Sequence, residues 1–231
     1  MRRAILAVIV TFFAFVSIGA AAPPGPKLVD VNPWQYDPFN GSLVESDWMN
    51  HLGCPYNAAI NTYDSSGNLV AGTYTDPGCP VQYRGDPNVQ GLLLSKTGPT
   101  ANVVAAGAEL RGIAGIQLTD IGYDIRKHGG YDSPLGSHCG AGAPRFNVVT
   151  NFGTHFIGCA SPPPVSQVMG MGWTRLAWSP AAAFPPIIPG SVVQTIDIVF
   201  DEGTDTGPDY FGLAILDNIM VNGVSVGRRV S

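Results

Sequence analysis

The chain has 231 residues and a formal net charge of −5, from 12 basic and 17 acidic side chains. This negative balance argues against nucleic acid and anionic membrane surfaces as partners. Glycine (29) and proline (20) are abundant and only 13% of residues are charged, which is typical of short strands joined by tight turns, while 45% hydrophobic residues argue against disorder.

The first 22 residues have the three parts of a secretory signal peptide. Arg2 and Arg3 precede an apolar run over residues 4–16, and small residues continue to Ala22. The run is nearly long enough to span a bilayer, so an uncleaved membrane anchor is the alternative. We expect a secreted protein, extracellular or periplasmic, with no membrane span after signal cleavage.

The remaining chain is expected to form one large β domain. Residues 23–38 are rich in proline and predict an irregular leader, and the domain follows over residues 39–231. Many short strand candidates and no convincing long helix predict an all-β fold, a two-layer antiparallel β-sandwich, with a barrel as the alternative.

Four cysteines in a chain bound for an oxidising compartment predict two disulfides. A turn signal, at residues 64–68 and again at residues 151–153, lies between the members of each consecutive pair. Each pair would therefore close the open end of its own hairpin. A metal–thiolate site is the alternative, but no C-x-x-C spacing is present. We predict the bridges Cys54–Cys79 and Cys139–Cys159.

Two segments in the middle of the chain predict different elements. Residues 105–115 carry apolar residues at a helical spacing, so a helical turn is expected there, although three glycines weaken it. In residues 118–126, apolar side chains alternate with Asp120, Asp124 and Arg126. This alternation predicts a strand with one buried and one solvent-exposed face.

Residues 210–223 are the strongest strand candidate. Their apolar side chains repeat at a period of two, and Asp217 falls on the apolar face. A buried, unpaired carboxylate is costly, so Asp217 should have an arginine, backbone N–H groups or a cation beside it. The alternatives are a strand bulge that turns it to solvent, or a salt bridge to Arg111, Arg126 or Arg175.

The loop over residues 201–209 places three aspartates and one glutamate in a short segment. Hard cations bind several oxygens of a flexible loop, so Asp201, Asp205 and Asp209 are candidate metal ligands. A solvated acidic turn is the alternative.

Aromatic side chains could provide a flat platform on which sugar rings stack, although tryptophan in a sandwich more often fills the core. The candidates are Trp34, Tyr36, Trp48, Tyr131, Trp173 and Trp178. Trp173 lies beside Arg175 on one face of a predicted strand over residues 172–178, so we expect it to be exposed. We predict ligand binding by Trp173, Arg175 and Tyr131.

Two strands resemble those of known secreted modules. Leu216-Asp217-Asn218-Ile219 with Val221 resembles the last strand of jelly-roll domains of the galactose-binding-like and carbohydrate-binding kind, and residues 118–126 resemble their mid-sheet strand. The resemblance implies a jelly-roll sandwich that binds a glycan. Because such modules often hold a structural calcium ion near their first and last strands, it also implies Asp217 as a calcium ligand.

Catalysis is not indicated by the sequence. No G-x-S-x-G elbow is present, the four histidines are dispersed, and the three glutamates form no pair along one strand. The first hypothesis is a non-catalytic secreted sandwich that binds a polysaccharide, a cell-surface glycan or another extracellular polymer. A structural, cell-envelope or adhesion protein without a small ligand is the first alternative, and a secreted hydrolase is the second.

Overall fold

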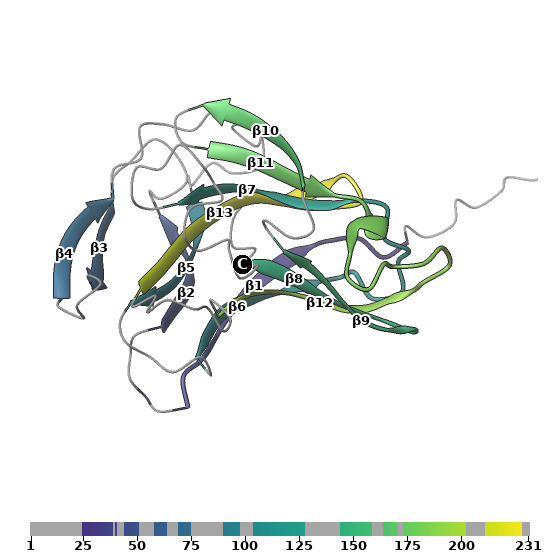
Figure 1. Ribbon diagram of the computed structural model, residues 1–231, viewed down its shortest axis with the longest axis horizontal. Coiled ribbons are helices and arrows are strands. Elements are labelled where there is room, and N and C mark those ends of the chain that lie inside the picture. Colours follow the sequence, from purple (N-terminus) through teal and green to yellow (C-terminus); the bar gives the residue numbers. More distant parts are fainter. Residues whose placement is uncertain are drawn as a thin grey trace, which may run out of the picture.

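The computed structural model shows two antiparallel β-sheets packed face to face, with a separate two-stranded sheet (Figure 1). The predicted all-β, two-layer sandwich is therefore confirmed. The structure describes residues 25–38, 40, 44–50, 58–63, 69–74, 90–97, 104–127, 144–158, 164–170, 173–201 and 211–227. The predicted signal peptide lies outside these residues. None of the described helical segments has the length and apolarity that a membrane-spanning helix needs.

The small sheet has the strand order β1-β6-β12-β8-β9 and forms the lower layer in Figure 1. Its strands are β1 (Asp30–Tyr36), β6 (Ala105–Arg111), β12 (Val193–Phe200), β8 (Arg145–Thr150) and β9 (Gly153–Gly158).

The large sheet has the order β10-β11-β7-β13-β5-β2, with β14 pairing on β13. Its strands are β10 (Val165–Gly170), β11 (Trp173–Trp178), β7 (Ile121–Lys127), β13 (Phe211–Val221), β5 (Gln90–Thr97), β2 (Val44–Asn50) and β14 (Val224–Val226). The third sheet pairs β3 (Ala58–Tyr63) with β4 (Leu69–Tyr74), and a 3-10 turn, η2, spans Pro180–Ala182.

The core lies between the small sheet and the large sheet and contains one aromatic cluster. The rings of Tyr123 and Phe146 lie 5.3 Å apart, and Trp178 packs edge-on against both. The buried hydroxyl of Tyr123 donates to the Pro144 carbonyl, and burial raises the pKa of Tyr123 well above its ordinary value. This cluster joins β7 and β11 of the large sheet to β8 of the small sheet.

The predicted hairpins are both present. β3 pairs with β4 from Ala58 to Tyr63, and β8 pairs with β9 around the two-residue turn that follows Thr150. The four cysteines that were predicted to close these hairpins lie outside the described residues. The two disulfides stay predictions.

Two sequence-based expectations for the small sheet are wrong. The irregular leader contains β1, which is the edge strand of the sheet and pairs with β6 over its whole length. Pro33 is compatible with this position because an edge strand leaves some of its N–H groups unpaired. The expected helical turn is strand β6, because Ala106, Ala108 and Leu110 alternate into the core.

A β-bulge explains why Asp217 interrupts an apolar pattern. The register between β13 and β7 shifts between Asp217 and Met220, and Asn218 takes a left-handed conformation with φ 47°. The extra residue moves Ile219 and Val221 onto the core face, while Asp217 stays on the opposite face beside its register partner Asp124. The bulge named above as an alternative is therefore confirmed, but Asp217 is buried rather than turned to solvent.

Candidate functional site

The outward side of the small sheet presents polar and aromatic side chains in one row across all of its strands. We call this side the open face. Asn32, Glu109, Asp197, Asn147 and Phe156 occupy directly opposed positions on β1, β6, β12, β8 and β9. All five are at least partly accessible to solvent. Because the row runs perpendicular to the strands, it forms a continuous track across the sheet.

Trp34 lies on this face with its indole over the backbone of β6. It sits opposite Gly107, where a Cβ atom would overlap both the indole and the carbonyl oxygen of Ile198. Only glycine leaves room for the ring at this point. The indole reaches across β6 and donates its Nε1–H to Asp197 Oδ1 on β12 at 3.1 Å. The ring is thus held along the sheet surface and is partly exposed.

The charged side chains of the open face differ in how they are paired. Arg145 binds Asp201 with both terminal nitrogens, at 2.5 and 2.6 Å. Arg111 contacts Glu109 at 3.1 Å. The carboxylate of Asp197 has a neutral donor, the indole of Trp34, as its only hydrogen-bond partner among the described residues. Burial, opposed by that hydrogen bond and reinforced by the charge of Glu109, raises the pKa of Asp197 above its ordinary value.

The raised pKa predicts how stability responds to pH at this position. A carboxyl group whose pKa is raised in the folded state destabilises the fold at neutral pH, and this cost is removed as the pH falls through the raised pKa. We expect Asp197→Asn, which keeps an acceptor for the indole, to raise Tm at pH 7 and to lose this advantage in acid. Thermal unfolding of both proteins over a pH series measures the difference; a gap that is independent of pH would contradict the assignment.

A second aromatic group lies at the β9 end of the row. Phe156 on β9 forms a bridge with Phe184, and each backbone N–H binds the other residue's carbonyl oxygen at 2.8–2.9 Å. Opposed residues of an antiparallel bridge project to the same side, so both rings lie on the open face. Phe184 is 76% exposed. β6 and β9 are three strands apart, and Gly107, beneath the indole, lies two residues along β6 from Glu109 of the row, so Trp34 and Phe156 are roughly 16 Å apart.

The outward side of the large sheet is different around β7 and β13, where the charged side chains of Asp124, Arg126 and Asp217 are buried. Asp124 is 3% exposed and accepts two hydrogen bonds from Arg175, at 2.7 and 2.8 Å, and one from Asn218 Nδ2 at 2.8 Å. The hydrogen bond with Asp124, together with the charges of Asp124 and Asp217, raises the pKa of Arg175. The solvent-exposed face predicted for residues 118–126 is therefore wrong, since Asp124 and Arg126 are buried.

The sequence-predicted ligand residues do not form an exposed platform. Trp173 is 2% exposed, so the exposure expected for it is wrong. It begins β11 in the same outward direction as Arg175, whose guanidinium is bound to Asp124. Tyr131 lies outside the described residues. Of the other aromatic candidates, Trp48 and Trp178 are buried, whereas Trp34 and Tyr36 project from β1 and are accessible.

The predicted metal ligands are divided between the two sides of the sandwich. Asp201 is bound to Arg145 beside the open face, whereas Asp217 lies on the outward side of the large sheet and accepts the Asn218 N–H at 2.6 Å. Asp205 and Asp209 lie outside the described residues. Within the described ranges, no group of three His, Cys, Asp or Glu side chains could hold a metal ion. A calcium ion at Asp201 would compete with the guanidinium of Arg145, which already binds both carboxylate oxygens, so Asp201 is not suited to be a calcium ligand. The calcium ion stays a prediction.

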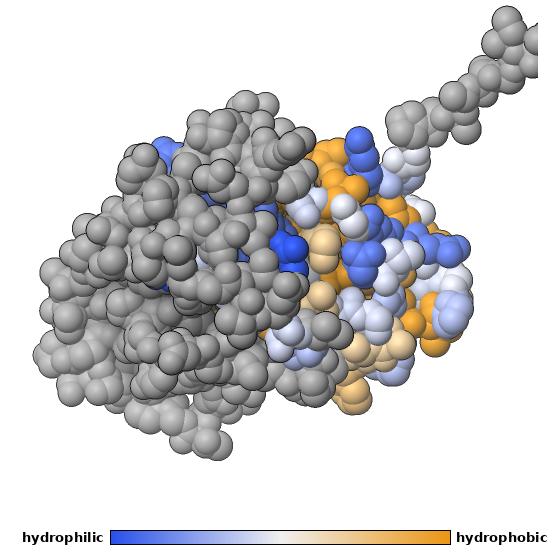
Figure 2. All heavy atoms as spheres, turned by 90° about the horizontal axis from the view of Figure 1, so that it is seen from above, coloured by the Kyte–Doolittle hydropathy of each residue, from blue (hydrophilic) through white to orange (hydrophobic). Residues whose placement is uncertain are grey.

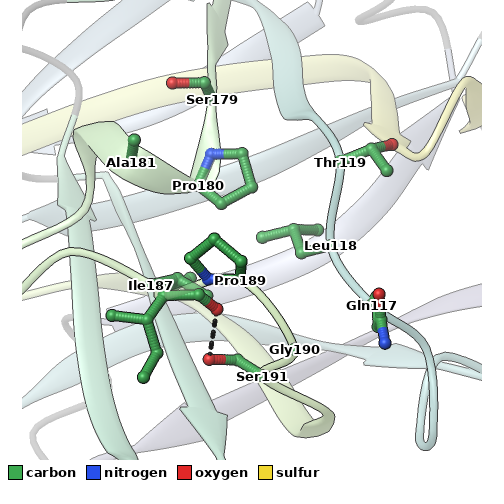
Figure 3. A pocket seen from close by; sticks show the side chains of 11 residues that line it. Gln117, Leu118, Thr119, Ser179, Pro180, Ala181, Ile187, Pro189, Gly190 and Ser191 are labelled. Atoms are coloured by element: carbon green, nitrogen blue, oxygen red, sulfur yellow. Dashed lines mark hydrogen bonds between the residues drawn. The ribbon is translucent and has the colours of Figure 1, made fainter.

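A cleft of about 450 Å³ opens at one end of the sandwich, between the connection before β7 and the connection from η2 to β12. Figure 3 shows that Leu118, Pro180, Ile187 and Pro189 converge on it. The surface of the molecule at this end carries both apolar and hydrophilic residues (Figure 2). The Ser191 hydroxyl is already bound to the Ile188 carbonyl at 2.7 Å. The cleft therefore offers apolar contact but few converging polar groups.

Several residues of the open face were missed by the sequence analysis. Trp34 and Tyr36 were named only among many aromatics, and Asp197, Asn147 and Gly107 were not singled out. The sequence of residues 30–36 does contain a pattern that indicates the exposed face of a strand. Its polar and aromatic side chains occupy every second position, at Asp30, Asn32, Trp34 and Tyr36. Gly107 could not be recognised, because its role depends on a partner strand far away in the chain.

Comparison with known proteins gives one structural similarity. No protein-family model matches the chain, and no curated protein matches it. Among solved structures, it is similar to the family 11 carbohydrate-binding module of the cellulosomal cellulase Lic26A-Cel5E of Clostridium thermocellum, with 11% sequence identity and a TM-score of 0.38. The similarity covers 88% of this chain and 97% of the module.

Proposed function

We propose that the protein is a secreted, non-catalytic β-sandwich that binds an extended glycan along the open face. The ligand would cross the strands, with one sugar ring stacked on Trp34 and another part of the chain against Phe156 and Phe184. Glu109, Asp197 and Asn147 lie between these aromatic groups and would bind hydroxyl groups of the intervening rings. A polymer several sugar rings long fits this track better than a single sugar.

The observation that carries this proposal is the indole of Trp34, held over Gly107 and accessible from outside. Sugar rings have an apolar face that packs on a flat aromatic surface, and their hydroxyl groups need donors and acceptors at its edge. Here Asp197 lies at the edge of the indole ring and accepts a hydrogen bond from its Nε1–H. A stacking surface and a hydrogen-bonding group are therefore fixed relative to each other before any ligand arrives.

Affinity electrophoresis through gels that contain soluble polysaccharides tests this function. The panel should include neutral, acidic and amino-sugar polymers, and the wild-type protein is expected to be retarded by at least one of them. Trp34→Ala is expected to migrate as in an empty gel. Normal migration of the wild-type protein in every gel would remove glycan binding as its function.

The exposed phenylalanines favour a second candidate, a structural or adhesion role based on self-association. Phe184, Phe152 and Phe156 are 76%, 61% and 42% exposed, and all three lie on or beside β9, the edge strand of the small sheet. Exposed aromatic side chains at a sheet edge are typical of sites where protein chains associate.

If this edge joins two copies, Phe184→Ser is expected to convert a dimer into a monomer. Sedimentation velocity over a range of protein concentrations measures this. A wild-type protein that stays monomeric at the highest concentration would contradict self-association. The exposed phenylalanines would then be assigned to glycan binding.

A further inference from the structure

We propose that the open face selects glycans whose sugar rings carry a free ammonium group over neutral glycans of the same linkage. This inference rests on the proposed glycan binding and specifies the chemical class of the ligand. Its basis is the charge distribution around Trp34.

In the part of the chain that the structure describes, the open face and its edge carry more acidic than basic side chains. Asp30, Glu109, Asp197 and Asp201 are acidic, and Arg111 and Arg145 are the basic side chains within hydrogen-bonding or ion-pair distance of them among the described residues. Both arginines are already committed. Arg145 is bidentate with Asp201, and Arg111 lies 3.1 Å from Glu109 and 3.9 Å from Asp30. Among the described residues, the acidic side chains of this surface therefore outnumber the basic ones by two.

The excess charge is concentrated where the ligand would bind. Asp197 and Glu109 are directly opposed on β12 and β6, and like charges at opposed positions of neighbouring strands repel each other. Asp197 is half-buried and receives only a neutral N–H. A cationic group placed near Asp197 would remove this repulsion, whereas a sugar hydroxyl would not.

The indole adds a second attraction for a cation. An ammonium group near the face of tryptophan is attracted by the ring quadrupole, and this attraction increases when the cation is partly desolvated. On the open face, the indole and the carboxylate of Asp197 are 3.1 Å apart at their nearest polar atoms. One ammonium group could therefore contact both at once. A neutral sugar ring would gain only the stacking contact with the indole.

The test compares three β-1,4-linked oligosaccharides of equal length: glucosamine, N-acetylglucosamine and glucose oligomers. Isothermal titration calorimetry at low salt and mildly acidic pH, where the amines are protonated, measures their affinities. We expect the glucosamine oligomer to bind the wild-type protein about tenfold more tightly than the other two. Asp197→Asn is expected to remove most of this preference, whereas Glu45→Gln, which removes one negative charge on β2 of the other sheet, is expected to retain it.

The outcomes separate this inference from the proposed function. Equal binding of all three oligosaccharides, lost in Trp34→Ala, would overturn the charge selection and leave glycan binding intact. No binding of any of them, together with no retardation by any polysaccharide, would overturn both. Tight binding of an oligolysine of matched charge, also lost in Trp34→Ala, would reassign the face to a cationic peptide. Glucosamine binding that is unchanged in Trp34→Ala would show unspecific attraction and overturn the inference.

Discussion

Replacement of Trp34 by alanine is expected to reduce glycan affinity by about thirtyfold or more, because a central aromatic contact in a binding surface contributes about 2 kcal/mol or more. The indole supplies the stacking surface and also donates to Asp197, so alanine removes both the platform and the group that orients the carboxylate. Calorimetric titration with the best ligand of the panel measures the loss.

Two further variants make this result specific. Trp34→Phe keeps a flat ring but lacks the N–H, so we expect an affinity between those of the wild type and the alanine variant. Ile188→Ala truncates an exposed side chain that lines the cleft, and it is expected to bind like the wild type. Loss of binding in Ile188→Ala with normal binding in Trp34→Ala would move the site from the open face to the cleft.

Replacement of Asp124 by alanine is expected to destabilise the protein by about 2–3 kcal/mol, because it removes the buried acceptor of three hydrogen bonds and leaves the donors of Arg175, whose side chain is partly exposed, and of buried Asn218 without it. Asp124 accepts hydrogen bonds from Arg175 and Asn218, which come from the two neighbouring strands β11 and β13. Its carboxylate therefore links the central strands of the large sheet on their outward side. Urea unfolding of the variant measures the change in the free energy of unfolding.

The matched control is an ion pair on the solvent-exposed side of the other sheet. Glu109 and Arg111 are 45% and 49% exposed in their side chains, and exposed pairs contribute little to stability. Glu109→Ala should therefore stay within about 1 kcal/mol of the wild type. Equal losses in Asp124→Ala and Glu109→Ala would contradict the different burial of the two sheet faces.

Much of the fold follows from local patterns in the sequence. The alternation of Ile121, Tyr123 and Ile125 predicts the core face of β7, and the same period predicts β12 and β13. These segments are long enough for the alternation to distinguish a strand from a helix. The two hairpins are predictable because strand candidates flank clear turn signals.

The remaining features depend on contacts between distant segments. The prediction of a helical turn at residues 105–115 is wrong because their apolar spacing fits a helix as well as a strand, and the local sequence does not show that Gly107 provides room for Trp34 on another strand. The burial of Asp124 follows from its bonds to Arg175 and Asn218, 51 and 94 residues away. Trp34 was placed in an irregular leader because proline signals outweigh a short alternation.

The most direct test of the open face is NMR observation of the tryptophan indole N–H signals during titration with the bound oligosaccharide. The chain has four tryptophans, and Trp34→Phe identifies one signal by its disappearance. We predict that the Trp34 indole signal moves together with the backbone amides of Gly107, Asn147 and Asp197, while those of Trp48, Trp173 and Trp178 stay in place. Shifts confined to residues 117–119 and 179–191, with the Trp34 signal unchanged, would contradict binding at the open face.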